Sequence, residues 1–180
     1  MLDADSLRQP DGWQPGDYQR TLLTRLGDRD PADVQAETPG LIRALIAEAG
    51  EHLRVRPQPR EWSVLQCIAH ICDAELVIGG RYRWILAHEA PDILPYDQDL
   101  WVDHLHDNNE DPQVMLSVFE PLRQADIALW RQTPVASRSR LGLHRERGPE
   151  SYELTFRITA GHDLVHMDQA RKTLDAVRGG

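Results

Sequence analysis

Apolar and polar residues follow the α-helical period through most of this chain, and the starts of its helices are clearly marked. A capping side chain precedes a proline at Asp30-Pro31, Thr38-Pro39 and Asp111-Pro112, and proline is favoured at the first position of a helix. Ser63 and Gln66 have the spacing of a capping box. The pattern therefore predicts a short helix near 16–26, a short helical turn at 31–36, and long helices near 39–52, 63–88, 112–132 and 150–178.

Two long connections separate these helices. Residues 90–109 carry two prolines and many acidic side chains, and a short helix is expected there only around Leu100. Residues 133–149 are expected to form a loop, because no stretch shows strand alternation flanked by hairpin turns. Four long helices with two long connections are typical of an all-α four-helix bundle with crossover connections. We expect residues 1–28 to form a helical extension packed on the bundle, and residues 29–180 to form the bundle itself.

The last predicted helix places two histidines on its buried face. On a helical wheel its charged residues gather on one side, which marks the solvent face. His162 and His166 lie opposite that face, one turn apart, so both imidazoles are expected to point into the protein. This spacing lets one helix offer two nitrogens to one metal ion, and the alternative is a pair of hydrogen-bonded core histidines. Four polar residues share their stripe and indicate a polar-lined cavity: Thr155, Thr159, Gln169 and Thr173.

A third metal ligand is expected from a facing helix. In the helix that begins near Ser63, His70 shares a row with Val77 and Trp84, at steps of seven residues, on a second and partly apolar face. Taken alone, such a histidine is more often a core residue than a ligand. Together with the pair on the last helix, it completes a candidate set of three imidazoles.

Charge and length narrow the class of protein. The chain has 180 residues, enough for one domain with a proper core, and a formal net charge of −9. Nucleic acid is excluded as the main partner, because phosphate binding needs a clustered positive field and the 19 arginines and one lysine are dispersed. No apolar run approaches the roughly 20 residues of a membrane-spanning helix, and the acidic N-terminus lacks the pattern of a secretory signal. We therefore expect a cytoplasmic protein that does not enter the membrane.

Several other candidate residues have simpler interpretations. Cys67 and Cys72 lie five apart on a helix, so we expect small core residues and no disulfide between them. His104 and His106 could form a second metal site, but solvated loop histidines fit their acidic surroundings better. His144 is expected to hydrogen-bond to its own loop. Four nearby basic residues are expected to be solvated: Arg138, Arg140, Arg145 and Arg147.

Several of these segments, taken together, resemble one known family. Residues 60–64 (REWSV) and 69–75 (AHICDAE) resemble the second helix of the DinB/YfiT-like family of metalloenzymes. Residues 94–99 (LPYDQD) are similar to the connection that follows it in one branch of the family. Residues 142–148 and 160–169 (AGHDLVHMDQ) resemble the final segment. The segments occur in the expected order, and the resemblance covers roughly residues 38 to 175.

The resemblance implies a fold, an assembly and a set of metal ligands. The fold is a four-helix bundle with a crossed, up-down-down-up topology, and the assembly is a homodimer. The resemblance also implies one divalent metal ion, nickel or zinc, held by His70, His162 and His166. Three protein ligands would leave a coordination position open for water or substrate. Asp73 and Asp163 are candidates for fixing the imidazole tautomers, although either could be an ordinary surface carboxylate.

The leading functional hypothesis is a metal-dependent enzyme that activates a low-molecular-weight thiol for transfer to an electrophile. It comes from the three histidines together with relatives that are implied to be thiol S-transferases or thiol-dependent isomerases. Two alternatives stay open. One is a hydrolase that uses a metal-activated water. The other is a stress-associated binding protein without catalysis, in which the metal is structural or the pocket sequesters a ligand.

Overall fold

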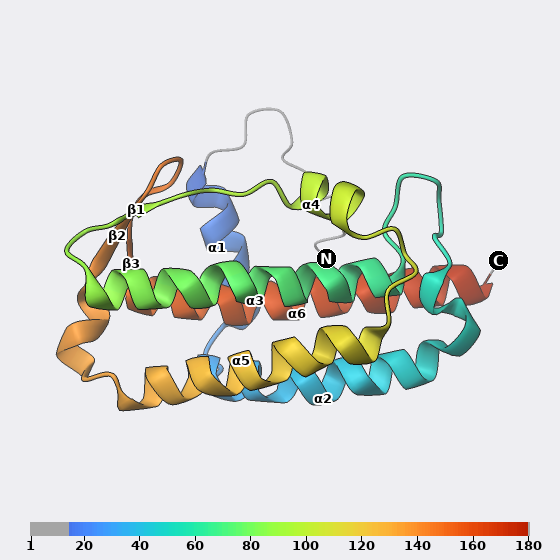
Figure 1. The fold of residues 1–180 in the computed structure, drawn as a ribbon, viewed down its shortest axis with the longest axis horizontal. Coiled ribbons are helices and arrows are strands. Elements are labelled where there is room, and N and C mark those ends of the chain that lie inside the picture. The colour runs from blue at the N-terminus through green and yellow to red at the C-terminus, as the bar shows by residue number, and fades with distance from the viewer. Residues whose placement is uncertain (1–14, 180) are drawn as a thin grey trace.

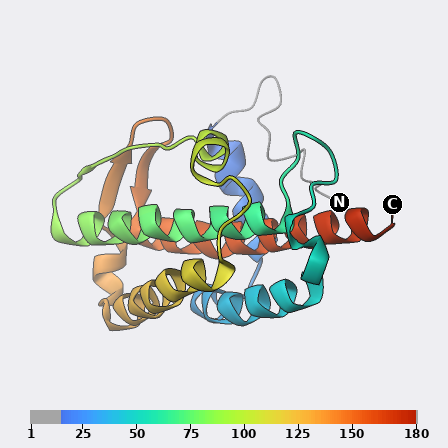
Figure 2. The ribbon, with the colours of Figure 1, turned by 45° about the vertical axis from the view of Figure 1, so that its right-hand side comes forward.

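The computed structural model describes residues 15–179, and the chain is mostly helical (Figure 1). Four long helices make the bundle: α2 (Pro31–Ala49), α3 (Val64–Ala87), α5 (Pro112–Gln132) and α6 (Tyr152–Gly179). Helices α3 and α6 form one layer, and α2 and α5 form the other (Figures 1 and 2). Because α2 and α6 run in one direction and α3 and α5 in the other, the predicted crossed, up-down-down-up bundle is confirmed.

Shorter elements connect and cover the bundle. The connection from α3 to α5 contains α4, so the predicted short helix around Leu100 is confirmed. The shorter elements are α1 (Pro15–Leu26), η2 (Gly50–Arg54), β1 (Asp92–Ile93), α4 (Gln98–Leu105), η3 (Val135–Ser139), β2 (Leu141–His144) and β3 (Gly148–Ser151). Within residues 15–179, no helix combines the length and the apolar character needed to cross a membrane.

The second helix is continuous where the sequence predicts two pieces. Asp30 caps α2 as expected, but Pro39 lies inside the helix and does not begin a new one. A proline within a helix leaves the carbonyl four residues earlier without its usual partner. Here that carbonyl belongs to Gln35, and Nη1 of Arg123 donates a long hydrogen bond of 3.4 Å to it. The prediction of a helix start at Thr38-Pro39 was wrong because a side chain from another helix takes the exposed carbonyl.

The second long connection also differs from its prediction, because it contains a small sheet. Strands β2 and β3 pair antiparallel, and β1 joins β2 in parallel. Three of the four arginines predicted to be solvated hold this connection in place, and one of them, Arg138, donates to the carbonyl of Trp130 and lies over its ring. Arg140 donates to the carbonyls of Ile85 and His88 at the end of α3, and Arg147 pairs with the buried Glu150. Strands this short, containing glycine and proline, carry little of the alternation that identifies a strand.

Two large apolar clusters make up most of the core, a third and smaller cluster lies around Leu26, and a polar layer crosses the middle of the bundle. One cluster lies around the first part of α3 and includes Ile42, Leu45, Leu65, Ile68, Phe119 and Leu174. The other lies around the second part of α3 and includes Tyr82, Ile85, Trp130, Tyr152 and Phe156. Near the middle of the four long helices stand buried polar residues: Thr38, His70, Glu75, Arg123, Asp126, His162, Asp163 and His166. A polar layer at the middle of a bundle costs stability unless every group is paired, so it marks the place to look for function.

Helix α1 packs against α6 through an unusually close backbone contact. Leu22 and Leu26 of α1 are each 1% exposed. The carbonyl of Leu22 lies over Gly161, where an added Cβ would be 2.2 Å from the carbonyl oxygen. Only glycine allows this approach, because any side chain at position 161 would meet backbone atoms that cannot swing away.

We therefore expect Gly161→Ala to separate α1 from α6 and to lower the free energy of unfolding by about 2–4 kcal/mol, the range of a poorly relieved core overlap. Urea unfolding checks this prediction. Gly40→Ala is the matched control, because Gly40 lies in α2 with open space around its Cβ position, and alanine there should raise stability by about 0.5–1 kcal/mol. Equal effects of the two substitutions would contradict the account of this contact.

Candidate metal centre

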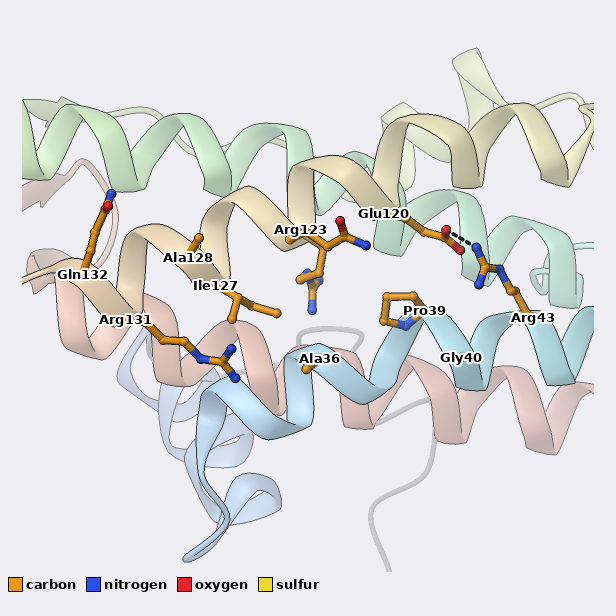
Figure 3. Close-up of a pocket in the computed structure, with 11 residues that line it drawn as sticks. Ala36, Pro39, Gly40, Arg43, Glu120, Arg123, Ile127, Ala128, Arg131 and Gln132 are labelled. Carbon is orange, nitrogen blue, oxygen red and sulfur yellow. Dashed lines mark hydrogen bonds and ion pairs between the residues drawn. The ribbon is translucent and has the colours of Figure 1, made fainter.

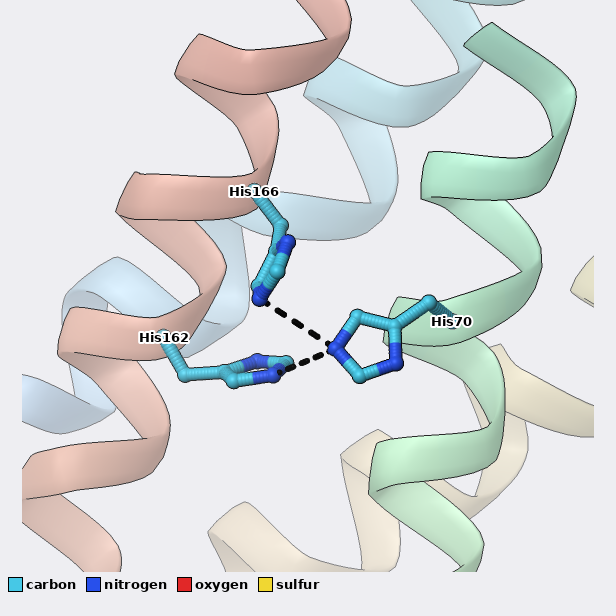
Figure 4. A group of neighbouring side chains, drawn as sticks. All are labelled: His70, His162 and His166. Carbon is cyan, nitrogen blue, oxygen red and sulfur yellow. Dashed lines mark hydrogen bonds between the residues drawn. The ribbon is translucent and has the colours of Figure 1, made fainter. Parts of the chain in front are cut away.

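The three histidines singled out from the sequence meet at one point in the polar layer. His70 comes from α3, and His162 and His166 come from successive turns of α6 (Figure 4). Nε2 of His70 lies 2.9 Å from Nε2 of His162 and 3.2 Å from Nε2 of His166. Their side chains are buried, at 1%, 4% and 1% exposure for His70, His162 and His166. The structure thus brings together all three predicted residues.

Local helix geometry explains this convergence. Residues four apart lie on the same face of a helix, so His162 and His166 project side by side from α6. Helices α3 and α6 pack along each other, which places His70 opposite the pair. The start of α3 is fixed by the predicted capping box, in which the Ser63 hydroxyl accepts from the Gln66 amide and the Gln66 side chain accepts from the Ser63 amide. This cap sets the register that carries His70 to the centre.

Burial favours the neutral imidazole at His70 and at His166. Burial, reinforced by the neighbouring histidines, lowers the pKa of His70 well below its ordinary value, and burial does the same for His166. A neutral imidazole keeps one nitrogen free to accept or to bind a metal. Nε2 of His70 has either one proton or one lone pair, so it cannot make good hydrogen bonds to Nε2 of both His162 and His166 at the same time. A divalent ion would satisfy all three together.

The spacing of the nitrogens fits a metal ion. Zinc binds imidazole nitrogen at about 2.0–2.1 Å in a tetrahedral arrangement, which separates neighbouring ligand nitrogens by about 3.3 Å. The observed separations of 2.9 and 3.2 Å are close to that value. The three ligand atoms all lie within 4.8 Å of one another, and within residues 15–179 no cysteine or carboxylate joins this group. The donor set is therefore three neutral nitrogens, which suits zinc, nickel and other borderline ions.

A glutamine fixes the orientation of one imidazole. Nδ1 of His166 lies 2.8 Å from Oε1 of Gln169, to which it donates, and this leaves Nε2 free to face the centre. The wheel placed Gln169 on the same stripe as the histidines, but only as a cavity residue. The ring of Trp62 stacks near His166 and tilts over His70, with centroid distances of 6.2 and 5.2 Å, and it covers this side of the centre with an apolar surface.

Gln169→Ala should weaken metal binding without removing it. Without the Gln169 oxygen that accepts from Nδ1, His166 could adopt the other tautomer and its ring could rotate. Loss of such a hydrogen bond to a metal ligand typically lowers metal affinity by about 10–100-fold. Calorimetric titration with zinc and with nickel would measure the change. Gln169→Glu, which keeps an acceptor at the same place, should retain most of the affinity; an affinity of Gln169→Ala equal to that of the parent would contradict this role.

The two predicted carboxylate partners have different roles. Oδ1 of Asp163 is 3.9 Å from Nδ1 of His162, too long for a hydrogen bond, and that nitrogen is buried without a hydrogen-bond partner among the described residues. Asp73 does not approach the three histidines through a hydrogen bond; its carboxylate instead pairs with His106 at 2.8 Å. Of the two candidates, only Asp163 lies beside the centre.

His106 corrects a second expectation. It was interpreted as a solvated loop histidine, yet its side chain is only 12% exposed. Nε2 faces Asp73 and Nδ1 faces Glu110, at 2.8 and 2.9 Å. The backbone carbonyl of His106 also accepts from Gln66, so the end of α4 is fastened to the first turns of α3. The sequence could not show that His106 is held in this way. Asp73 belongs to α3, and Glu110 lies in the connection that follows α4.

A buried ion cluster beneath the three histidines escaped the sequence analysis. Arg123 of α5 is 1% exposed and forms ion pairs with Asp163 and with Glu75, the latter at 2.9 Å. Burial opposes ionisation of Asp163, but the guanidinium of Arg123 outweighs it and lowers the pKa of this carboxyl to about 2. Burial dominates at Glu75 and raises its pKa to about 7. The hydroxyl of Thr38 donates to Asp163 at 2.8 Å.

The available sequence signal for this cluster was an arginine on an apolar stripe. Arg123 lies between Phe119 and Ile127, at the spacing of the buried face of α5. An arginine at such a position must find buried carboxylates, because an unpaired charge there is prohibitively costly. Its two partners come from α3 and α6, which no local pattern in α5 reveals.

The remaining predictions concern histidine and cysteine side chains away from the centre. His144 is buried, and its Nδ1 accepts from two backbone amides of its own turn, so the expected loop hydrogen bonding is confirmed. Cys67 and Cys72 are buried and free, as expected. Burial raises the pKa of both thiols to about 12. Neither thiol is therefore available as a nucleophile near neutral pH.

Comparison with known proteins agrees with this geometry. A metal-dependent hydrolase of Oceanobacillus iheyensis, so named provisionally, is 30% identical over 106 residues, 59% of this chain and 61% of that protein. YfiT of Bacillus subtilis carries the same provisional name and is 30% identical over 70 residues, which cover 39% of each chain. The chain thus spans less than two thirds of the length of these curated relatives.

A solved structure extends the comparison to the whole fold. YfiT from Bacillus subtilis superposes with a TM-score of 0.71 at 21% identity, covering 94% of this chain and 93% of that one, and its bundle is described as having an unusual topology. This likeness shows a shared fold. The model of the DinB superfamily matches residues 32–170, which include the whole polar layer and all three histidines. The chain belongs to the DinB superfamily.

Proposed function

We propose that His70, His162 and His166 bind one divalent ion, nickel or zinc, and that the protein is a metal-dependent enzyme that transfers a low-molecular-weight thiol to an electrophile. The observation that supports this proposal is the convergence of three buried Nε2 atoms, 2.9 and 3.2 Å apart, from two helices. Two relatives whose names class them provisionally as metal-dependent hydrolases also support a metal at this position.

The protein groups around the centre would hold the ion and orient its ligands. With three protein ligands, an ion leaves a position open and lowers the pKa of the thiol or water that fills it. Gln169 keeps Nε2 of His166 directed at the centre. Trp62 and the buried helix surfaces limit the access of water, which strengthens electrostatic interactions within the site.

The carboxylate beside the centre is occupied, which supports a thiol as the nucleophile. Asp163 lies next to His162 but pairs with Arg123, so it is not free to act as a general base for a metal-bound water. A thiol starts from a pKa of about 8.5 and needs less help to ionise. Since Cys67 and Cys72 are buried with raised pKa values, the thiol would come from a small molecule.

The proposed reaction is a nucleophilic substitution at carbon. The thiol loses its proton to solvent, its sulfur forms a new bond to the electrophilic carbon, and the bond from that carbon to the leaving group breaks. The leaving group departs with the bonding electron pair. No oxidant or reductant is needed.

Hydrolysis is the competing function, because both curated relatives are provisionally named hydrolases. A panel that separates the two uses the zinc- and nickel-loaded protein with a chlorodinitrobenzene electrophile plus cellular thiols, and with nitrophenyl esters and an anilide without thiol. Thiol-dependent turnover that is lost in His70→Ala, but kept in the exposed-histidine control His88→Ala, would support transfer. Turnover of the esters or the anilide without thiol, lost in His70→Ala but kept in His88→Ala, would instead support hydrolysis and overturn the transfer proposal.

A non-catalytic binding role is the third outcome of the same panel. No turnover of either class above the His70→Ala background, together with one bound ion per chain, would overturn the enzyme proposal and favour a stress-associated metal- or ligand-binding protein. Family resemblance further leads us to propose a cytoplasmic homodimer. Sedimentation velocity of the metal-loaded protein tests the dimer, which a mass near the 20.5 kDa of one chain would contradict.

A further inference from the structure

A concave site lies on the layer opposite the one that carries the three histidines. It is an open groove of about 850 Å³ between α2 and α5 (Figure 3). Its size falls within the roughly 300–1,000 Å³ of small-molecule sites. The residues that line it are Ala36, Pro39, Gly40, Arg43, Glu120, Arg123, Gln124, Ile127, Ala128, Arg131 and Gln132.

The groove follows from small residues on two facing helices. Ala36 and Gly40 on α2, and Ala128 on α5, occupy positions where larger side chains would fill the space between the helices. Pro39 and Ile127 supply an apolar surface between them. From Glu120 to Gln132 the lining of α5 extends about 18 Å, at 1.5 Å per residue. The shape suits an elongated ligand with an apolar body.

The charges of the groove are opposite in sign to those of the chain as a whole. Three arginines and one glutamate line it, while the chain carries a net charge of −9. At one end Arg43 pairs with Glu120, as Figure 3 shows. At the other end Arg131 is exposed, and among residues 15–179 no acidic side chain pairs with it. One guanidinium is therefore left to meet an anion.

The deepest residue of the groove has an unused donor. Arg123 is 1% exposed, and its terminal nitrogens are engaged by Asp163 and Glu75, but its Nε has no hydrogen-bond partner among the described residues. A buried N–H without a partner is uncommon and costs free energy. This observation is independent of Arg131, and it concerns a residue that lines the same groove.

We propose that the α2/α5 groove binds an elongated organic anion, with its apolar chain or rings on Pro39 and Ile127 and its acidic head group at Arg131. The site is separate from the three histidines and does not depend on the proposed function. A ligand there would also touch Arg123, which pairs with the Asp163 carboxylate beside His162.

Fluorescence titration with 1-anilinonaphthalene-8-sulfonate, an aromatic anion that brightens in apolar surroundings, tests the proposal. We expect saturable binding of one probe per chain. Arg131→Gln should weaken it about three- to fivefold, as expected for one partly exposed charge contact. Ala128→Trp, which fills the groove from an exposed position, should weaken it by about tenfold or more. Decanoate should displace the probe, and decanol should not.

Two controls locate the binding. Arg145→Gln removes an exposed arginine in the β2–β3 turn and should bind like the parent. His70→Ala, which alters the metal centre, should do so as well. Equal affinity of Arg131→Gln and Arg145→Gln, loss of binding in His70→Ala, or displacement by decanol as strong as by decanoate would each overturn the proposal. A dimer that Ala128→Trp dissociates, without probe binding to the parent, would assign the groove to a second copy of the chain instead.

Discussion

Arg123→Met is expected to lower the free energy of unfolding at pH 7 by about 3–5 kcal/mol, the usual result of removing one partner from a buried ion cluster. Methionine fills much of the space but leaves Asp163 and Glu75 without their counter-charge. It also leaves the Gln35 carbonyl, exposed by Pro39, without its donor. Urea unfolding of the metal-free protein, followed by far-ultraviolet circular dichroism, measures the change.

Arg43→Ala is the matched control for this effect. Arg43 also lies at the α2/α5 boundary and pairs with a glutamate, but its side chain is 61% exposed, and exposed ion pairs contribute about 0–1 kcal/mol. If Arg43→Ala and Arg123→Met lower the free energy of unfolding equally, the buried cluster around Arg123 contributes no more to stability than an exposed ion pair. The account of the polar layer would then be wrong.

The loss caused by Arg123→Met should shrink as the pH falls. In the parent, the pKa of Asp163 is lowered from 3.8 to about 2, so its contribution is fully present above about pH 4 and is lost as the pH falls toward 2. In the variant the Thr38 hydroxyl still donates to this carboxyl, but without the guanidinium the burial that raises its pKa is largely unopposed, so protonation stabilises the variant as the pH falls. Unfolding at pH 7.0 and 4.5 checks this; a difference between the proteins that is larger at pH 4.5 would contradict it.

Metal binding should produce the second large effect, a rise in stability. An ion that binds the folded chain at one hundred times its dissociation constant stabilises it by about 2.7 kcal/mol, and by about 4 kcal/mol at one thousand times. Zinc or nickel should therefore raise the melting temperature of the parent by several degrees, because about 1 kcal/mol corresponds to roughly 2–4 °C in a domain of this size. Differential scanning calorimetry with and without each ion measures the shift.

Each of His70→Ala, His162→Ala and His166→Ala should abolish this stabilisation, since a site with two imidazoles holds the ion much more weakly. His88→Ala removes an exposed histidine at the end of α3 and should respond to metal like the parent. An equal metal-dependent shift in all five proteins would mean that the ion binds elsewhere.

The periodic parts of the sequence predicted the long helices and the burial of His162 and His166, while the crossed topology and the joining of His70 to this pair in one metal site were implied by the family resemblance. His162 and His166 lie opposite the charged face of their helix, and that face is indeed outside, where Arg171 and Arg178 pair with Glu48. Long helices with buried stripes leave few ways to pack, so the burial of His70 opposite the pair follows once α3 and α6 are neighbours. A wheel drawn from one helix is enough to find the pair on α6, but not to identify His70 as its third member.

What the sequence did not reveal depends on contacts between distant segments. Pro39 normally breaks a helix, yet α2 continues because Arg123, 84 residues away, lies against the exposed carbonyl. Strands β2 and β3 are held by Arg140 and Arg147 rather than by alternation of their own residues. One of the two partners of His106 is Asp73, on another helix. In each case the deciding group is a side chain whose position is set only by the folded bundle.

Elemental analysis of purified protein is the most direct test of the claim that the three histidines form a metal site. After reconstitution with zinc or nickel and removal of loose ions, we expect about one ion per chain in the parent and in His88→Ala, and essentially none in His70→Ala, His162→Ala and His166→Ala. Retention of about one ion per chain in all three variants, or none in the parent, would contradict the claim.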